Sequence, residues 1–353
     1  MLFSSRSKPL IGLDITTSSI KMVEMSGSLQ NCRAECYAAE ATPPNSINEK
    51  TIVDAAAVGD AIRRAVKRAG TKTREVAIAI SGDAAITKVI QLPKALTGNQ
   101  LEQQVEVQAD QYIPFPMEEV SYDFELMGPS KTDPDMQDVL LVATRTENVD
   151  QRRAAVEAAG LIPKVVDVEA FALENACQLM VHQMPDGGMG HLVALVDFGA
   201  SNTTFSVLKD MRVIYTRDFS FGGQQLTEEI MRTYGLSLED AGRAKKEGGL
   251  PSNYGPEVLE PFVDDMTQQV SRSLQFFLAS AGGREQPNHI LVCGGCANIP
   301  GVADVISSKV GIPTEIGDPL GQIKLSSRAK AQGLRKDATA LLTACGLALR
   351  SFG

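Results

Sequence analysis

An aspartate that follows an apolar run and precedes a turn of small residues is the strongest chemical feature of the sequence. Asp197 ends the run Leu192–Val196, which is typical of a buried strand, and the turn Phe198–Asn202 leads to a second strand from Thr203. Small residues let backbone N–H groups approach an anion, as in phosphate-binding loops. A carboxylate at the end of the strand can hold a hydrated divalent metal beside that phosphate. An ordinary hairpin with a polar turn would have the same pattern.

The same pattern occurs a second time, near the N-terminus. Asp14 follows an apolar run and aligns without a gap with Asp197, 183 residues later. A duplication of this length differs from a solenoid repeat, and it predicts two similar domains that face each other across one ligand. Two such loops would hold a polyphosphate and its metal from both sides. The loop residues are Asp14, Thr16, Thr17, Ser18 and Ser19 in the first copy, and Asp197, Gly199, Ala200, Ser201 and Asn202 in the second.

The composition is that of a globular protein with two domains. The chain has 353 residues, of which 43% are hydrophobic and 22% are charged, and its net charge is −9. An acidic chain without tryptophan lacks the basic surface and the stacking platform of a nucleic-acid-binding protein. No apolar run approaches the roughly 20 residues of a membrane span, and Met1–Pro9 has no apolar leader segment. These observations predict a cytoplasmic protein.

One pair of cysteines has the spacing of a metal or redox site. Cys293 and Cys296 are separated by two glycines, but the sequence has no second pair of this kind, and its three histidines are scattered. A metal or redox role is therefore the less favoured interpretation.

The elements that must position the two loops alternate between strands and helices. In the first half, the helix Asp54–Ala69 is closed by Gly70, and a buried strand spans Glu75–Ile80. This order favours an α/β domain with helix-covered sheets. The further expected strands are Ile86–Leu92, Val120–Met127, Val139–Thr144, Val165–Val168, Arg212–Phe221 and His289–Cys293. The further expected helices run from a cap at Thr97 to Tyr112, over Glu147–Ala159, from Asp167 to Cys177, from Gln224 or Leu226 to Tyr234, over Pro256–Ala279 and over Asp337–Leu349.

Taken in order, these pieces resemble the actin-like ATPase superfamily, and within it the PilM family of type IV pilus assembly proteins. The segment 86–159 resembles the inserted subdomain of FtsA and PilM proteins, and Gln111–Glu119 resembles a PilM signature. The resemblance implies an α/β, actin-like ATPase fold with two duplicated domains, at 1–187 and 188–353. Their inserted subdomains would span 86–159 and 226–287, and Met184–Gly190 would link the two halves.

The resemblance also implies ATP and Mg²⁺ between the halves. The phosphates would contact both loops and Lys21, and Asp14 and Asp197 would lie near the metal, through water. Glu169 is the one candidate for positioning an attacking water, and a first-turn glutamate stabilised by the helix dipole is the alternative. The adenosine side of the site would be formed by Gly222, Gly223, Lys245, Gly294, Gly295 and Cys296.

Two positions depart from the family pattern. Thr16 stands where first loops usually have a glycine, and a threonine would be strained there if the position needs a positive φ. Gly242 stands where the pattern Ala-Glu-x-x-Lys has its glutamate, whose carboxylate faces the adenosine together with the lysine. Both departures would weaken nucleotide binding.

By resemblance, the chain is a cytoplasmic ATP-binding adaptor and at most a slow ATPase. Its partner would be the cytoplasmic N-terminal peptide of a PilN-like inner-membrane protein, docked near the inserted subdomain, and the chain would reach the membrane only through this partner. An actin-like small-molecule kinase is the alternative, with Asp167 as the candidate base. An FtsA-like filament-forming protein shares the fold, but no amphipathic membrane-binding tail follows Ser351. Self-association stays open.

Overall fold

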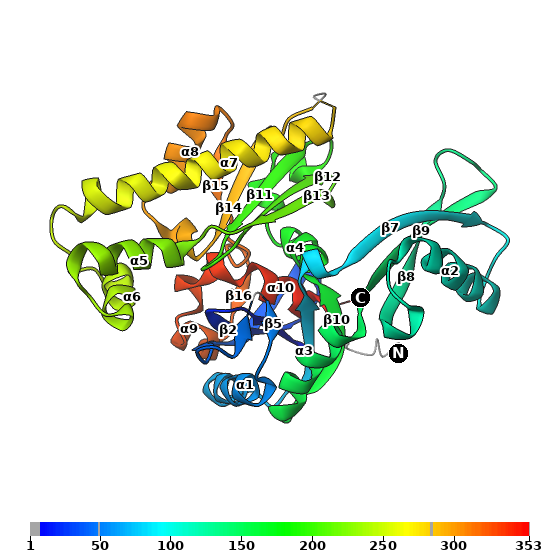
Figure 1. Ribbon diagram of the computed structural model, residues 1–353, viewed down its shortest axis with the longest axis horizontal. Coiled ribbons are helices and arrows are strands. Elements are labelled where there is room, and N and C mark those ends of the chain that lie inside the picture. The colour runs from blue at the N-terminus through cyan, green and yellow to red at the C-terminus, as the bar shows by residue number, and fades with distance from the viewer. Residues whose placement is uncertain (1–7, 49, 283–284, 353) are drawn as a thin grey trace.

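Two sheets, one in each half of the chain, form the framework of the computed structural model, which describes residues 8–48, 50–282 and 285–352 (Figure 1). In spatial order, the first sheet consists of β10 (Ile162–Val168), β6 (Glu75–Ile80), β1 (Ile11–Ile15), β2 (Ser19–Ser26), β3 (Arg33–Ala41) and β16 (Lys324–Leu325). The second sheet consists of β13 (Arg212–Phe219), β12 (Thr203–Lys209), β11 (Leu192–Phe198), β14 (His289–Gly294) and β15 (Thr314–Ile316).

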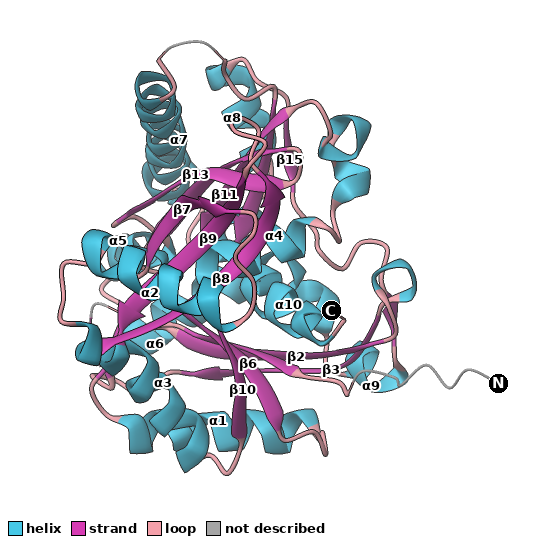
Figure 2. Cartoon of the chain, turned by 90° about the vertical axis from the view of Figure 1, so that its right-hand side faces the viewer, coloured by secondary structure: helices cyan, strands magenta, loops and turns pink. Residues whose placement is uncertain are grey.

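Helices cover both faces of each sheet, as Figure 2 shows. α1 (Ala55–Ala69) and α3 (Thr146–Ala158) share a core with one face of the first sheet. α5 (Gly223–Tyr234), α6 (Leu238–Glu247), α7 (Glu260–Ser280) and α8 (Val302–Val310) share a core with one face of the second. Two helices, α4 (Glu169–Cys177) and α10 (Leu342–Ala348), lie between the sheets and contribute to the cores of both halves. The short helix α9 (Ser327–Ala331) packs beside β3.

A third sheet projects from the first half (Figure 1). Its strands, in spatial order, are β7 (Ile86–Pro93), β9 (Met136–Arg145) and β8 (Val120–Pro129). α2 (Asn99–Tyr112) packs on one face, where Leu101 and Val105 join a separate core with Ile90 and Leu141. We call residues 86–145, which form these strands and α2, the inserted subdomain. Its chain enters and leaves beside the hairpin of β4 (Ile47–Asn48) and β5 (Thr51–Ile52).

Two segments pack on a different part of the molecule from the one to which the predicted domain boundaries assign them. α3 falls within the predicted insertion 86–159, but Ala155 and Val156 are buried in the core that it shares with α1. Residues from Leu320 onward fall within the predicted second domain, but β16 pairs with β3, and Leu320 and Leu341 are buried against the first sheet. The chain therefore crosses back to the first half at its C-terminal end.

The first two long helices show how local residues set a helix boundary. α1 is capped by Asp54, whose Oδ1 accepts a hydrogen bond from Ala57 N (2.9 Å), and it is closed, as predicted, by Gly70, which has a left-handed conformation with φ 65°. The predicted cap at Thr97 is wrong. Gly98, with φ 52° and ψ −134°, is the N-cap of α2 and has no side chain that could cap the helix. Thr97 lies one residue before this cap.

The helix predicted over Asp337–Leu349 is divided. A 3₁₀ turn over Ala338–Leu341 precedes α10, because Leu341 has the non-helical angles φ −106° and ψ 10°. α10 then packs very closely on its neighbours. A Cβ placed on Gly346 would lie 1.7 Å from the carbonyl oxygen of Ala172 in α4.

Within the described residues, no helix is long and apolar enough to cross a membrane. Residues 1–7, which include most of the segment expected to lack a leader, lie outside the described part of the chain.

Candidate functional site

The two aspartate loops have the same backbone hydrogen bond. Thr16 N donates to Ser19 O (3.0 Å) in the first loop, and Gly199 N donates to Asn202 O (3.0 Å) in the second. Each residue of the second pair lies 183 positions after its counterpart, the separation found for the aspartates. The sequence duplication therefore extends to individual hydrogen bonds.

The strands that carry the aspartates also share one register. Asp14 on β1 lies opposite Lys21 on β2, and Asp197 on β11 lies opposite Thr204 on β12. Both pairs are antiparallel and keep the same separation in sequence. The two halves thus present an acidic residue at the same place at the end of their first strand.

The two loops meet between the halves. Thr17 Oγ1 and Ser201 Oγ lie 3.0 Å apart, within hydrogen-bond distance, although 184 residues separate them in the chain. The prediction from the sequence was that the duplicated loops face each other across one site. The contact brings the loops together as that prediction requires.

Three charged side chains lie beside this contact. Lys21 Nζ lies 2.8 Å from Asp14 Oδ2. Burial lowers the pKa of Lys21, but the charge and hydrogen bond of Asp14, together with the charges of Asp197 and Asp337, outweigh this effect, so the pKa is raised. Burial raises the pKa of Asp197 to about 6, with Lys21 opposing the rise and Asp14 adding to it. The site holds two carboxylates and one ammonium in partly buried surroundings, where a further cation or a metal-bound phosphate would relieve the repulsion between the acids.

The carboxylates of Asp14 and Asp197 fit a hydrated metal better than a directly ligated one. In residues 8–48, 50–282 and 285–352, no group of three or more histidine, cysteine or acidic side chains could hold a metal ion. Mg²⁺ commonly keeps several waters and takes one or two carboxylates together with phosphate oxygens. A pair of acids beside loops of small residues is consistent with that coordination.

The strain expected at Thr16 is not present. Neither Thr16 nor its counterpart Gly199 has a positive φ. Thr16 Oγ1 donates to Ser19 O (2.8 Å) and accepts from Ser19 N (3.2 Å), so the hydroxyl ties the first loop together. At Gly199 a Cβ would lie 2.7 Å from Asn202 O. The second loop therefore leaves less space for a side chain than the first loop. The strain expected at Thr16 does not occur.

Gly222 and Gly223 pack against the second loop. A Cβ on Gly222 would lie 2.4 Å from Ala200 O. Gly223 N donates to Gly199 O (3.0 Å), and Gln224 N donates to Ala200 O (2.8 Å). The resemblance implies that Gly222 and Gly223 lie on the adenosine side of the site. In this structure the N–H groups of Gly223 and Gln224 bind the loop carbonyls and fix the loop in place.

Lys245 and Cys296 lie on the other side of Gly223. Lys245 Nζ donates to Gly223 O and to Thr227 Oγ1, at 2.7 Å each, and burial lowers its pKa. A Cβ on Gly223 would lie 3.0 Å from Cys296 Sγ and 3.5 Å from Lys245 Nζ. The structure thus brings three of the predicted adenosine-side residues together. Gly242, one turn before Lys245, has no atom within 4 Å of an added Cβ.

The two cysteines of the glycine-rich turn face different neighbours. Cys293 Sγ lies 3.7 Å from Gly317 O, and Cys296 Sγ lies 3.8 Å from Gly199 O. Both are buried and free, and burial raises the pKa of Cys296 to about 11. Protonated thiols that point apart do not form a metal or redox pair.

Gly294 and Gly295 differ in what surrounds them. Gly294 has φ 87°, and a Cβ there would lie 2.2 Å from Phe198 O and 2.6 Å from Asp197 Oδ1. Gly295 has no atom within 4 Å of an added Cβ. Gly294 is therefore required for the close approach of β14 to the second aspartate, whereas Gly295 faces open space.

Asp167, near the end of β10, and Glu169, the first residue of α4, have different surroundings. Burial raises the pKa of Glu169 to about 7, with the charges of Lys50 and Arg152 opposing the rise. Asp167 is buried, and its Oδ2 lies 3.4 Å from Arg350 Nε. Glu169 is thus near the charges of the cleft, whereas Asp167 is engaged by a C-terminal arginine.

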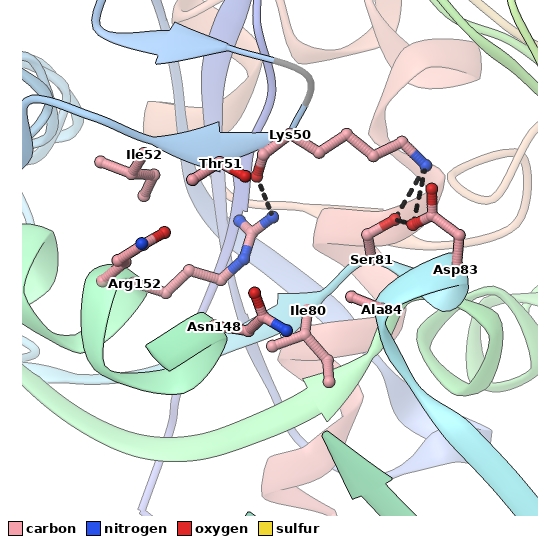
Figure 3. Close-up of a pocket in the computed structure, with 10 residues that line it drawn as sticks. Lys50, Thr51, Ile52, Ile80, Ser81, Asp83, Ala84, Asn148 and Arg152 are labelled. Atoms are coloured by element: carbon pink, nitrogen blue, oxygen red, sulfur yellow. Dashed lines mark hydrogen bonds and ion pairs between the residues drawn. The ribbon is translucent and has the colours of Figure 1, made fainter. Parts of the chain in front are cut away.

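Sequence reasoning missed a second cluster, at the root of the inserted subdomain. It surrounds a pocket of about 200 Å³ between the β4–β5 hairpin and α3, which Figure 3 shows. Lys50 Nζ lies 2.6 Å from Asp218 Oδ2 in the other half of the chain. No motif marks these residues, so only the three-dimensional arrangement could reveal them. The pocket is lined by Lys50, Thr51, Ile52, Ile80, Ser81, Asp83, Ala84, Asn148, Gln151 and Arg152.

Comparison with known proteins matches almost the whole chain to one family. The family described as type IV pilus assembly protein PilM matches residues 12–352. The cell division protein FtsA of Bacillus subtilis (strain 168) is 24% identical over 92% of this chain and 84% of its own length. The solved PilM-PilN type IV pilus biogenesis complex has a chain 28% identical to this one, with a TM-score of 0.79, over 98% of this chain and 99% of that chain.

A more distant structure shares the fold. The ethanolamine utilization protein EutJ from Carboxydothermus hydrogenoformans is 17% identical, with a TM-score of 0.56, over 100% of this chain and 94% of that chain. The predicted fold class, α/β and actin-like, is confirmed by these similarities.

Proposed function

The chain belongs to the family of the type IV pilus assembly protein PilM, and on this premise we propose that it is an ATP-binding adaptor of the pilus inner-membrane platform. ATP and Mg²⁺ bind between its halves. The cytoplasmic N-terminal peptide of a PilN-like inner-membrane protein binds near its inserted subdomain. The chain acts in the cytoplasm and reaches the membrane through this partner.

The contact between the duplicated loops carries the nucleotide part of the proposal. Thr17 and Ser201 touch across the two halves, and the small residues around them have the composition of phosphate-binding loops. Contact between the two copies of the loop indicates that a shared ligand or a shared interface lies between the halves. The buried acidic pair beside the contact favours a ligand that brings a cation.

Each part of the nucleotide has residues that suit it. The loop residues hold the phosphates, and Lys21, which contacts Asp14, supplies an ammonium group to them. Asp14 and Asp197 hold Mg²⁺ through water, and the metal, when bound, supplies positive charge to the phosphates. The adenosine lies along the surface formed by Gly222, Gly223, Lys245, Gly294, Gly295 and Cys296.

Turnover is slow or absent. Glu169 is the one acid at the start of α4 that is near the cleft charges, and its pKa of about 7 leaves it divided between the acid and the carboxylate at neutral pH. A single candidate base, with no second residue assigned to position the attacking water, supports binding and conformational change rather than rapid hydrolysis. ATP then acts by favouring the domain arrangement that it binds better.

The inserted subdomain has the surface expected of a docking site. Residues 86–145 contain six of the fourteen large apolar side chains that are exposed in the described residues. This share of the exposed apolar side chains on one small subdomain supports its use as a protein-binding surface. The six are Val89, Val107, Tyr112, Tyr122, Leu126 and Met127.

A binding experiment tests the proposal. Calorimetric titrations of the full chain with Mg·ATP and with a synthetic N-terminal peptide of a PilN-like protein are expected to give one site for each ligand. A phosphate-release assay is expected to show little turnover. Absence of binding for both ligands would contradict the proposal, and rapid phosphate release would contradict the adaptor role.

A further inference from the structure

Lys50 occupies an unusual backbone conformation at the edge of the cleft. It lies just before β5 and has φ 71°, a left-handed conformation that glycine or asparagine adopts more easily than lysine. Such a residue persists where its surroundings determine its position. The contacts of its side chain and of its carbonyl group therefore fix this conformation.

Within its own half, Lys50 makes polar contacts with the root of the inserted subdomain (Figure 3). Its ammonium donates to Ser81 Oγ (2.8 Å) and lies 3.6 Å from Asp83 Oδ1, and both residues precede β7, where the chain enters the subdomain. Its carbonyl oxygen accepts from Arg152 Nη2 (3.4 Å) on α3, where the chain has returned. Lys50 therefore contacts both chain crossings of the subdomain.

Those two crossings are also fixed to each other. Thr144 Oγ1, at the end of β9, donates to Ala84 O (2.7 Å). Asn148 Nδ2 on α3 donates to Thr144 Oγ1 (3.0 Å). A displacement at Ser81 or Asp83 is thus passed to the returning chain, and the subdomain would move on its root as one unit.

The same ammonium reaches the other half of the molecule. Lys50 Nζ lies 2.6 Å from Asp218 Oδ2 on β13, and both side chains are about one-fifth exposed. Asp218 Oδ1 accepts from Thr204 Oγ1 (2.7 Å), and Thr204 is the residue opposite Asp197 in the β11–β12 register. A continuous chain of contacts therefore runs from the subdomain root to the second aspartate loop. Partial burial makes this ion pair stronger than one at the surface.

We propose that Lys50 is the positioning residue that couples the nucleotide cleft to the inserted subdomain. This inference rests on the proposed function. A ligand that shifts the second half relative to the first changes the distance between Asp218 and Lys50. When the pair separates, the ammonium is held by Ser81 and Asp83 alone, and the subdomain root changes its position. A peptide that moves the root acts on the cleft through the same contacts, because coupling between two binding sites is reciprocal.

The substitution Asp218→Asn tests the coupling without changing a residue that lines the pocket. Asparagine still accepts the hydrogen bond from Thr204 but offers no charge to Lys50. Asp264→Asn is the matched control, because it breaks the ion pair of Asp264 with Lys309, which lies wholly within the second half. The probe is the synthetic PilN-like N-terminal peptide, titrated calorimetrically into the full chain with and without saturating Mg·ATP.

In the unsubstituted chain, Mg·ATP is expected to change the peptide Kd by about fivefold or more, as in known allosteric proteins. In Asp218→Asn both ligands are expected to bind, but the peptide Kd should differ by less than about twofold with and without Mg·ATP, whereas Asp264→Asn keeps the full effect. A full effect in Asp218→Asn overturns the proposal, as does binding of both ligands to the unsubstituted chain with no mutual effect.

A ligand-free measurement separates failure of this inference from failure of the proposed function. Small-angle X-ray scattering on the unsubstituted chain, Asp218→Asn and Asp264→Asn reports the arrangement of the halves. Asp218→Asn alone is expected to change the scattering profile, because a contact between the halves is lost. If Mg·ATP or the peptide fails to bind the unsubstituted chain, the proposed function fails. An unchanged profile in Asp218→Asn then overturns the role of Lys50 as well.

Discussion

Asp197 carries an unfavourable charge in the ligand-free protein. Its pKa of about 6 lies above the ordinary value of 3.8, because burial and Asp14 disfavour the carboxylate. The folded state therefore binds this proton more tightly than the unfolded state does. The contribution of Asp197 to stability is present at low pH and is lost as the pH rises through about 6.

The substitution Asp197→Asn should therefore stabilise the ligand-free protein at pH 8 and have less effect at pH 5. The expected gain at pH 8 is on the order of 1–2 kcal/mol, below the full value of the pKa shift because the side chain keeps some contact with solvent. Thermal unfolding at both pH values measures it. A loss of stability at pH 8 would show that the carboxylate is favourable in the folded state.

Gly242 offers a test of the adenosine side of the site. An added Cβ meets no atom within 4 Å, and Lys245 lies three residues later on the same helix. Gly242→Glu restores the acid of the family pattern and should tighten Mg·ATP binding by about three- to tenfold, the effect of one hydrogen bond. Gly242→Ala separates this effect from helix propensity. Equal affinities of the two variants would place the adenosine elsewhere.

At the residue scale, the sequence predicts functional side chains that belong to a motif and gives no signal for those that do not. Asp14 and Asp197 stand out because their surroundings repeat. Lys50 and Asp218 have no such surroundings, and 168 residues separate them in the chain. Their proximity depends on how the halves pack, which local patterns do not encode. Strain was expected at Thr16, but a hydroxyl that bonds its own loop accommodates the residue.

The two helices between the sheets depend on close backbone contact. Gly346 on α10 faces Ala172 on α4, and Gly12 on β1 faces Ala344 on α10, where an added Cβ would lie 1.9 Å from the carbonyl oxygen. α10 therefore approaches both α4 and the first sheet without intervening side chains. This packing holds the two helices in the position from which Glu169 faces the cleft.

Gly346→Ala and Gly242→Ala should change stability in opposite directions, although both replace a helical glycine. In α6, where the space is open, alanine should stabilise by about 0.5–1 kcal/mol through helix propensity. In α10, the clash with Ala172 O should cost about 2–3 kcal/mol. Chemical denaturation of both variants measures the difference. A stabilising Gly346→Ala would show that α4 and α10 are not in close contact.

The turn after β14 gives a second matched pair. Gly294→Ala requires a positive φ at a residue with a Cβ and places that Cβ 2.6 Å from Asp197 Oδ1, so a loss of about 2–3 kcal/mol is expected. Gly295→Ala faces open space and should stay within about 0.5 kcal/mol of the unsubstituted chain. Denaturant midpoints report both. Equal effects would contradict the close approach of β14 to the second loop.

At the element scale, periodicity and end signals predict most of the fold. The helix from Asp54 to Gly70 and the strand Glu75–Ile80 have strong signals, and both are present. The Thr97 cap fails because the following glycine takes the cap position. The C-terminal helix is divided because its packing against α4 and β1 determines its path. Tertiary contact overrides the local pattern in the C-terminal helix.

At the scale of the whole molecule, the duplication predicts two halves around one cleft, and the resemblance predicts the fold. Neither predicts which segments cross between the halves. Residues from Leu320 onward return to the first sheet, and Lys50 reaches the second half through Asp218. In the proposed coupling, these crossings link a ligand in the cleft to the inserted subdomain.

The measurement that tests the central claim most directly is a calorimetric titration of Mg·ATP into the unsubstituted chain, Asp14→Asn, Asp197→Asn and the control Asp264→Asn. The two-loop site predicts one bound nucleotide per chain, with affinity lowered at least about tenfold in each loop variant and unchanged in the control, since each loop carboxylate contributes a charged interaction. Absence of binding to the unsubstituted chain, or loop variants that bind as well as the control, would contradict it.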